Sequence, residues 1–129
     1  MITDGKFVFI PHNTPSLKNA KQIIQCGGRP RLIPSATHRR YESETCWYWK
    51  QGAESFKALC IGNEKPYKVG FYFIRDSQRK FDFTSPTDTC QDMMVKHGWI
   101  EDDNMTEIIP VILGYEVNKE KAGVLITIL

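Results

Sequence analysis

Residues 67–104 read YKVGFYFIRDSQRKFDFTSPTDTCQDMMVKHGWIEDDN, and this stretch decides the fold. It begins with a strand from Tyr67 to Ile74 that has apolar side chains on both faces, which is typical of a central strand covered from two sides. A short helix is expected next. Ser85 can cap this helix, Pro86 suits its first position, and Gly98 sits where a C-terminal glycine belongs. The stretch therefore predicts a strand, a helix and a turn in succession.

The remainder of the chain supplies further strands and one long helix. Hydrophobic spacing predicts this helix from about Ala36 to Leu59, with Ser35 as its N-cap and with Tyr41, Tyr48 and Phe56 on one face. The other expected elements are strands at 6–10 and 22–24, a breaker at 27–31, a strand at 107–117 interrupted at Pro110, and a last strand at 124–128. This order predicts a two-layer α/β (α+β) sandwich, in which a small mixed sheet packs against two main helices.

Length and composition are those of one ordinary globular domain covering residues 1–129. Apolar residues make up 41% and charged residues 25%, which excludes a disordered chain. No apolar run approaches the roughly 18–20 residues that cross a bilayer, and the N-terminus lacks a signal-peptide pattern. The four cysteines have no metal-ligand spacing. We interpret them as reduced thiols of a cytoplasmic protein, with disulfides as the alternative.

The charge is distributed unevenly, although the net charge is only +2. Residues 1–81 carry 14 Lys and Arg against 6 Asp and Glu, whereas residues 82–129 carry 3 against 9. A basic half of this kind indicates nucleic acid as a partner. The alternative is that the two sets of charges simply neighbour each other on the folded surface.

Six carboxylates are concentrated between residues 82 and 103: Asp82, Asp88, Asp92, Glu101, Asp102 and Asp103. Asp88 and Asp92 are four residues apart, so one face of the short helix presents both. Hard oxygen ligands of this type suit Mg²⁺ or Mn²⁺ and not zinc. Such an ion would position a water and stabilise charge on a phosphate under attack.

Each carboxylate also has a purely structural interpretation. Asp88 could complement the positive N-terminus of the short helix, or complete a Ser-x-x-Asp box that begins at Ser85. Asp92 could pair with Lys96 one turn later. The run from Glu101 to Asp103 could be a solvated acidic turn.

The order and spacing of these residues resemble the RusA-type Holliday-junction resolvases, small metal-dependent endonucleases of phages and prophages. The family has an Asp-x-Asp-Asn motif before a helix, a further Asp within the helix, then a Gly and an Asp-Asp pair. The matching positions are Asp82, Asp92, Gly98, Asp102 and Asp103. The segments Pro15–Asn19 and Gly28–Ser35 also resemble loops of the family, so the likeness spans about residues 6–117.

Three positions depart from the pattern of many family members. The second aspartate of the family is Thr84 here, and the asparagine is Ser85. Where many members carry a helical lysine, this chain has Asp88, as does a branch of phage members. Asp88 lies one helical turn from Thr84, so Asp88 could supply the carboxylate that Thr84 lacks. Lost activity is the other outcome of the change at Thr84.

The resemblance implies roles for individual residues. Asp82, Asp88 and Asp103 would be catalytic metal ligands, with Asp92 in support and Asp102 able to exchange with Asp103. Phosphate contacts are expected from basic residues, because fixed positive charge releases counterions on binding: Lys18, Arg29, Arg31, Arg39 and Arg40. Arg39 and Arg40 could instead be solvated helix charges.

Three hypotheses of function follow. In the first, the chain is a Mg²⁺-dependent (or Mn²⁺-dependent) endodeoxyribonuclease that acts as a homodimer and resolves four-way DNA junctions by paired hydrolysis. It would work in the cytoplasm of a bacterial host. In the second, a branched-DNA-binding protein of the same fold has weakened or lost catalysis. In the third, the chain is a structural or adaptor protein that binds no nucleic acid.

Overall fold

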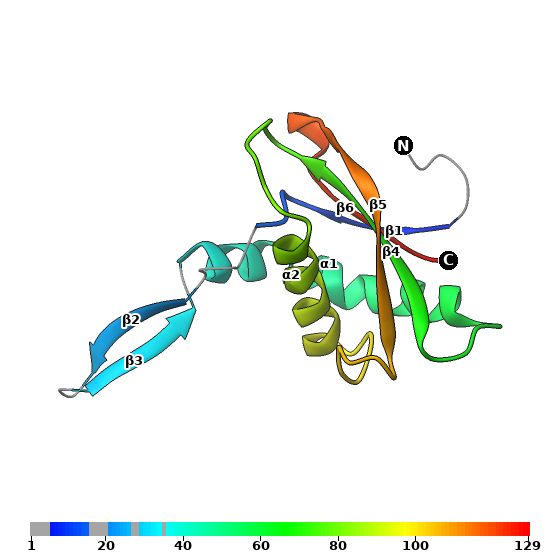
Figure 1. Cartoon of the computed structure of the whole chain (residues 1–129), viewed down its shortest axis with the longest axis horizontal. Coiled ribbons are helices and arrows are strands. Elements are labelled where there is room, and N and C mark those ends of the chain that lie inside the picture. Colours follow the sequence, from blue (N-terminus) through cyan, green and yellow to red (C-terminus); the bar gives the residue numbers. More distant parts are fainter. Residues whose placement is uncertain (1–5, 16–20, 27–28, 35) are drawn as a thin grey trace.

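The computed structural model describes residues 6–15, 21–26, 29–34 and 36–129, with side chains described for 6–15 and 36–129. Its main sheet has four strands in the order β1-β6-β4-β5 (Figure 1). Their bounds are Val8–Pro11, Gly123–Ile128, Tyr67–Arg75 and Ile108–Val117, respectively. β4 and β5 run parallel, and the other neighbours are antiparallel, so the sheet is mixed as predicted.

Two helices, α1 (Ala36–Cys60) and α2 (Thr84–Lys96), form the second layer. They contribute to one continuous core with the facing side chains of β1, β4 and β6. The fully buried members of this core with the largest side chains are Trp49, Phe56, Phe71, Phe73, Ile10, Met93 and Met94. Burial of this apolar face, at about 25 cal/mol per Å², holds the helices to the sheet. The two-layer α+β fold expected from the sequence is therefore confirmed.

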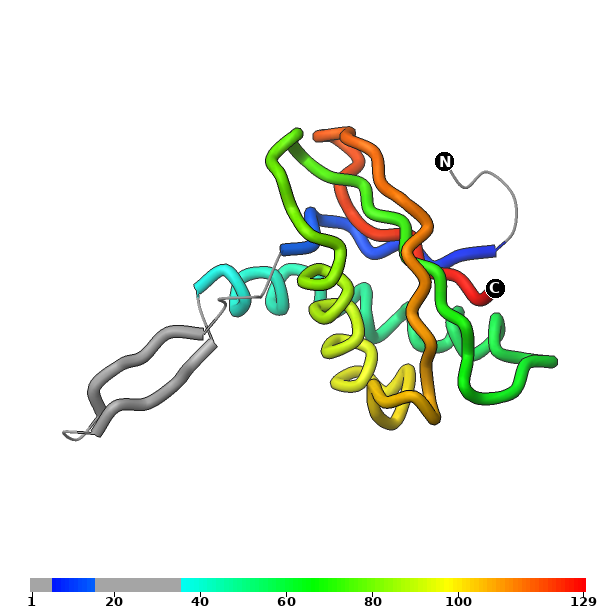
Figure 2. Tube along the Cα trace, viewed as in Figure 1, coloured from blue at the N-terminus to red at the C-terminus, as the bar shows by residue number. Residues whose placement is uncertain are grey.

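The chain passes from β4 through α2 to β5, and Figure 2 traces this path. β4 lies between β6 and β5, and its residues from Val69 to Arg75 are buried. The predicted central strand is thus confirmed. The predicted interruption at Pro110 is wrong, because β5 continues through this residue, which pairs with Val69. β5 is an edge strand, and an edge tolerates the missing N–H of proline.

The ends of α2 differ in how well the sequence predicted them. Gly98 has φ +79°, and the Trp99 N–H donates to the Met94 carbonyl, so this glycine ends the helix as expected. Ser85 is not the cap: Phe83 already has helical angles of φ −72° and ψ −24°. Pro86 is consequently the third residue of α2, and the box from Ser85 to Asp88 does not form at the helix start.

The long helix α1 covers nearly the predicted range. Tyr41 and Phe56 are buried as expected, but Tyr48 is 37% exposed and Trp49 occupies the core in its place. The Trp49 carbonyl accepts a hydrogen bond of 2.7 Å from the Trp99 indole N–H. This contact ties α1 to the turn after α2. The expected cap Ser35 lies outside the described residues.

A separate two-stranded sheet consists of β2 (Lys21–Cys26) and β3 (Arg29–Pro34). The sequence predicted only a short strand at 22–24 and a breaker at 27–31. Arg29 pairs with Cys26 and Pro30 with Gln25, so the second half of that breaker is a strand. Because each strand of a two-stranded sheet has an open edge, Pro30 can be accommodated there.

Candidate functional site

Asp82 lies just before α2, and its carboxylate caps the first turn of the helix, where Phe83 occupies the N-cap position without a side-chain cap bond of its own. Its Oδ1 accepts a hydrogen bond of 2.9 Å from the backbone N–H of Ser85, three residues later. This bond satisfies one of the N–H groups that the first helical turn leaves without a partner. Asp82 is exposed, so its carboxylate is accessible to solvent in addition to capping the helix. The sequence predicted Ser85 as the capping residue, whereas in the structure the capping side chain is that of Asp82.

Asp88 is the fifth residue of α2, and the charges of the other two candidate ligands act on its carboxyl group. Partial desolvation raises the pKa of the Asp88 carboxyl, and the negative charges of Asp103 and then Asp82 raise this pKa further. The three carboxylates come from the start of α2, its second turn and the loop before β5. The fold therefore brings Asp82 and Asp103 within electrostatic range of Asp88. For Asp103 the reason is that β5 returns parallel to β4, so the loop before β5 lies near α2.

The loop before β5 distinguishes Asp102 from Asp103. Asp102 uses both carboxylate oxygens locally: Oδ1 accepts from the Asp103 N–H at 2.8 Å, and Oδ2 accepts from the Asn104 amide at 3.1 Å. Within the described part of the chain, no hydrogen-bond donor occupies the Asp103 carboxylate. Asp103 is therefore better prepared than Asp102 to bind an ion.

The same loop is held to the protein by Glu107. Its Oε1 accepts from the Glu101 N–H at 3.1 Å and from Lys65 at 3.0 Å. The Lys65 ammonium, followed by the Glu101 N–H, lowers the pKa of the Glu107 carboxyl. Glu107 is buried, so this ion pair fixes the base of the loop that carries Asp103.

The two remaining positions on α2 are exposed. Asp92 faces solvent one turn beyond Asp88, and Thr84 is also exposed. Lys96, the structural partner expected for Asp92, hydrogen-bonds with Glu42 of α1.

A hard divalent cation suits the donor chemistry of Asp82, Asp88 and Asp103, since all three offer carboxylate oxygens and the charge on Asp88 is destabilised by the other two. Across residues 6–15 and 36–129, however, no three His, Cys, Asp or Glu side chains already stand in a ligating arrangement. These carboxylates would therefore have to converge when an ion binds.

The basic residues predicted from the sequence are only partly described. Arg39 and Arg40 are exposed on the first turns of α1. Arg29 and Arg31 belong to β3, but their side chains, like the whole of Lys18, lie outside the described residues.

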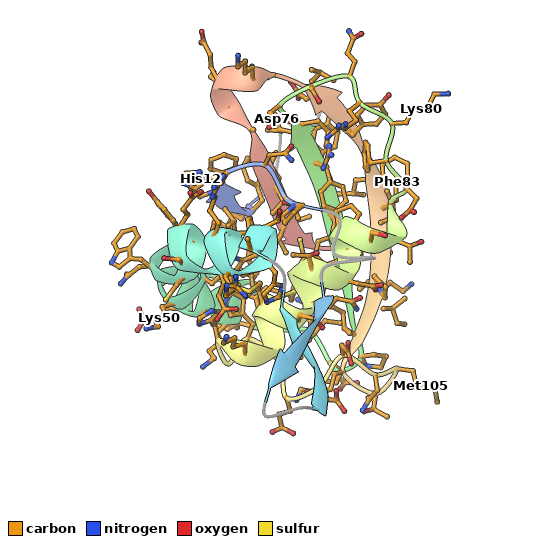
Figure 3. All side chains as sticks on the ribbon, turned by 90° about the vertical axis from the view of Figure 1, so that its left-hand side faces the viewer. His12, Lys50, Asp76, Lys80, Phe83 and Met105 are labelled. Carbon is orange, nitrogen blue, oxygen red and sulfur yellow. The ribbon has the colours of Figure 1, made fainter. Side chains whose placement is uncertain are left out.

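Sequence reasoning missed a second set of basic residues on the loop that joins β4 to α2. Arg75, Arg79 and Lys80 line a groove of about 650 Å³, and Asp82 lines the same groove. Lys80 extends outward from this loop (Figure 3). The signal in the sequence was the run RDSQRK at residues 75–80, shortly before Asp82.

Arg75 is the buried member of this set, with 7% of its surface exposed. Its Nη1 donates to the Thr14 carbonyl at 2.7 Å, and its guanidinium lies 4.3 Å from the centre of the Phe81 ring. Desolvation lowers the pKa of Arg75, and the charge of Asp76 partly opposes this shift. An arginine stays protonated in spite of such a shift, so Arg75 is a fixed positive charge in the lining of the groove.

None of the described helices has the length and apolar character needed to cross a membrane. Comparison with models of known protein families gave no match, and a search of curated proteins gave none either. The features of this chain that bear on function are the charges of Asp82 and Asp103, which both act on Asp88, and the groove that Asp82 lines together with basic side chains.

Proposed function

We propose that this protein is a metal-dependent endodeoxyribonuclease of the RusA type, which cuts four-way DNA junctions as a homodimer. One observation carries the proposal: partial desolvation, then the charge of Asp103 after α2 and that of Asp82 before it, raise the pKa of the Asp88 carboxyl. Carboxylates that repel one another at a protein surface are a suitable donor set for a divalent cation, because the cation removes the repulsion.

In this proposal Asp82, Asp88 and Asp103 hold Mg²⁺ or Mn²⁺. Bound there, the ion would supply a nucleophilic water and stabilise the negative charge that develops on the phosphate. Asp82 stays oriented because it also caps α2. Asp103 is positioned by the loop that Glu107 anchors, and Asp92 gives outer support. Two copies related by two-fold symmetry would make the paired nicks that a junction needs.

A second candidate is a branched-DNA-binding protein of the same fold with weakened or lost catalysis. It is favoured by Thr84, which replaces a carboxylate of the family. It is also favoured by the lack of a ready ligating group of three among the described side chains. The two candidates differ in one measurable property, which is metal-dependent cutting.

The test uses a labelled four-way junction, with a linear duplex of the same sequence as substrate control. Purified protein and its Asp82→Asn, Asp88→Asn and Asp103→Asn variants are incubated with Mg²⁺ or Mn²⁺. We expect paired nicks in the junction, loss of cutting of at least a hundredfold in the Asp82 and Asp103 variants, and a large loss in the Asp88 variant.

Glu101→Gln is the matched control, since it removes a carboxylate from the same loop without touching the proposed ligands. This variant should cut like the wild type. Tight junction binding with no cutting in either metal would refute the nuclease and support the second candidate. Near-wild-type cutting by Asp88→Asn would remove Asp88 from the site. An absence of junction binding at moderate salt would favour the adaptor hypothesis.

A further inference from the structure

The groove that Asp82 borders has four charged residues in its described lining, and three of them are cationic. It lies between the loop after β4, the segment after β1 and the start of α1. Arg75, Arg79 and Lys80 contribute cations, and Asp82 is the one carboxylate among its described lining residues. Arg79 and Lys80 are exposed, and neither forms a salt bridge with any side chain that the structure describes. Their charges are therefore available to a ligand.

The start of α1 adds to this positive field. Thr37, the second residue of α1, lines the groove, and the first turn of the helix has no acidic residue. The N–H groups of a first helical turn lack helical partners and carry partial positive charge, which favours an anion. The groove thus combines three cationic side chains with a helix N-terminus that no acidic side chain in its first turn neutralises.

Arg75 supplies a positive charge to the groove from a side chain that other residues hold in place. It is held by the Thr14 carbonyl and by the face of the Phe81 ring, so its position does not depend on a ligand. Its Nε is buried and has no hydrogen-bond partner among the described residues. A buried cation attracts an anion more strongly than a solvent-exposed lysine does, because the dielectric constant is lower in the protein interior.

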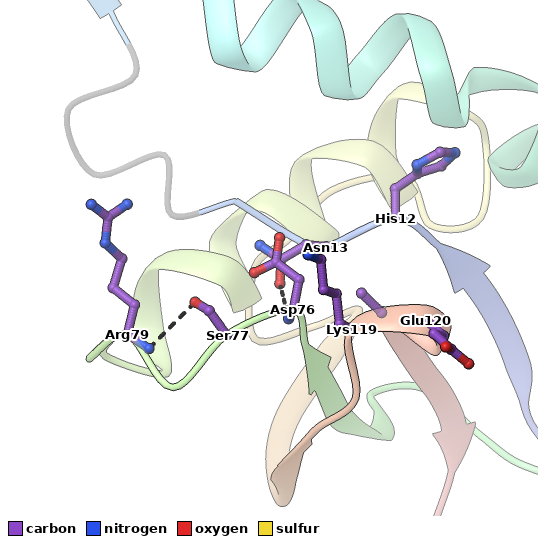
Figure 4. A pocket seen from close by; sticks show the side chains of 8 residues that line it. His12, Asn13, Asp76, Ser77, Arg79, Lys119 and Glu120 are labelled. Atoms are coloured by element: carbon purple, nitrogen blue, oxygen red, sulfur yellow. Dashed lines mark hydrogen bonds between the residues drawn. The ribbon is translucent and has the colours of Figure 1, made fainter.

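A neighbouring groove of about 660 Å³ provides a contrast. It shares Asn13 and Arg79 with the first groove, but Asp76, Lys119 and Glu120 complete much of its lining (Figure 4). Figure 4 shows Arg79 at one side of this neighbouring groove and Glu120 at the other. Its mixed charges do not favour an anion, so the two adjacent surfaces are expected to behave differently.

We propose that the groove lined by Arg75, Arg79 and Lys80 binds a backbone phosphate of the DNA strand that flanks the cleaved bond. Because Asp82 lines the groove and also belongs to the proposed metal site, a phosphate bound there lies next to the reacting one. Arg79 and Lys80 contact this phosphate directly, and the buried Arg75 attracts it through its charge. This inference rests on the proposed function, and it names the surface that guides the strand to the carboxylates.

The test measures binding of a labelled four-way junction by fluorescence anisotropy in EDTA, where no cutting occurs, at several concentrations of KCl. Lys80→Ala and Arg79→Ala alter the basic groove. Lys119→Ala is the matched control, because it removes a cation that lines only the neighbouring groove. Thermal melting of each variant establishes that the fold is retained.

We expect each groove variant to lower the slope of log K against log salt by about 0.9, the value for one phosphate contact. With 1 M salt as the reference at which this contribution vanishes, one contact corresponds to about eightfold in affinity at 0.1 M salt. The variant that combines Arg79→Ala and Lys80→Ala should therefore bind the junction about sixtyfold more weakly, and its slope should be lower by about 1.8. Lys119→Ala should bind within about twofold of the wild type, since it makes no such contact.

The outcomes separate this inference from the nuclease proposal. Wild-type affinity in the double variant, or an equal loss of affinity in Lys119→Ala, would refute phosphate binding in the groove but would leave the nuclease proposal standing. Loss of binding in the groove variants, combined with a wild type that cuts nothing in any metal, would support the groove and refute the nuclease. A wild type that binds no junction at any salt concentration would refute both.

Discussion

Substitution at Asp82 can separate its helix-capping role from its proposed role as a metal ligand. Its carboxylate caps α2 through the Ser85 N–H, and it is also a proposed metal ligand. Asparagine is as good an N-cap as aspartate but a far weaker ligand for a hard cation. Alanine can neither cap the helix nor bind a metal. We therefore expect Asp82→Asn to lose activity but keep its stability, and Asp82→Ala to lose both activity and stability.

The magnitude follows from the geometry of the cap. The hydrogen bond is 2.9 Å long and partly buried, so its loss in Asp82→Ala should cost about 1 kcal/mol in the free energy of unfolding. For a chain of 129 residues, an unfolding entropy of about 2.1 cal/mol/K per residue converts this cost into a fall in Tm of about 4 °C. In Asp82→Asn the lost attraction to the helix N-terminus is opposed by relief of the repulsion with Asp88, so Tm should stay within about 2 °C.

The assay is thermal unfolding of the three proteins by circular dichroism at pH 7 in EDTA, followed by junction cutting in Mg²⁺. EDTA removes any contribution of bound metal to stability, so only the cap is compared. Asp82→Ser is a useful control, because serine restores the cap without a carboxylate.

The capping role would be refuted if Asp82→Ala melted at the wild-type temperature. It would also be refuted if Asp82→Asn and Asp82→Ser melted as low as the alanine variant. Retained cutting in Asp82→Asn would leave the cap intact and remove Asp82 from the metal site.

Two further predictions concern charge and backbone in the same region. Because the folded-state pKa of Asp88 is raised above its ordinary value of 3.8, its ionised form destabilises the fold, and stability falls as the pH rises through the raised pKa. Asp88→Asn should therefore be more stable than the wild type at pH 7 in EDTA by about 0.2–1 kcal/mol, with the difference vanishing below pH 3.8; equal urea midpoints at pH 7 would contradict this. Gly98 has φ +79° with no atom near the position of an added Cβ, so Gly98→Ala should cost roughly 1–2 kcal/mol through backbone strain alone. An unchanged Tm would show that the turn relaxes.

Local signals in the sequence predicted the main elements correctly where one signal acted alone. The buried strand β4 was recognised from apolar residues on both faces, and the end of α2 from Gly98. The start of α2 was mispredicted because Asp82 and Ser85 are both good capping residues three positions apart. The backbone angles of Phe83 decide between them, and these angles depend on how the loop after β4 approaches the helix.

The candidate site was predicted in part. The carboxylates were identified by type and spacing, and the structure adds that Asp82 and Asp103 both act on Asp88. The distinction between Asp102 and Asp103 could not be predicted, because it arises from hydrogen bonds within one loop. The basic groove was missed for a similar reason: its lining combines residues that follow β1 and β4 with one that begins α1.

The sequence by itself determined the α+β class, the central strand, the two helices and the carboxylates that could hold a metal. Hydrophobic periodicity and residue chemistry are local properties, so they can be read along the chain. Only the tertiary structure decided which of these groups meet. The parallel return of β5 beside β4 places the loop of Asp103 within range of Asp88, and the packing of α1 beside the loop after β4 forms the groove next to Asp82. Such proximities join residues far apart in sequence, and they follow from packing against a shared core.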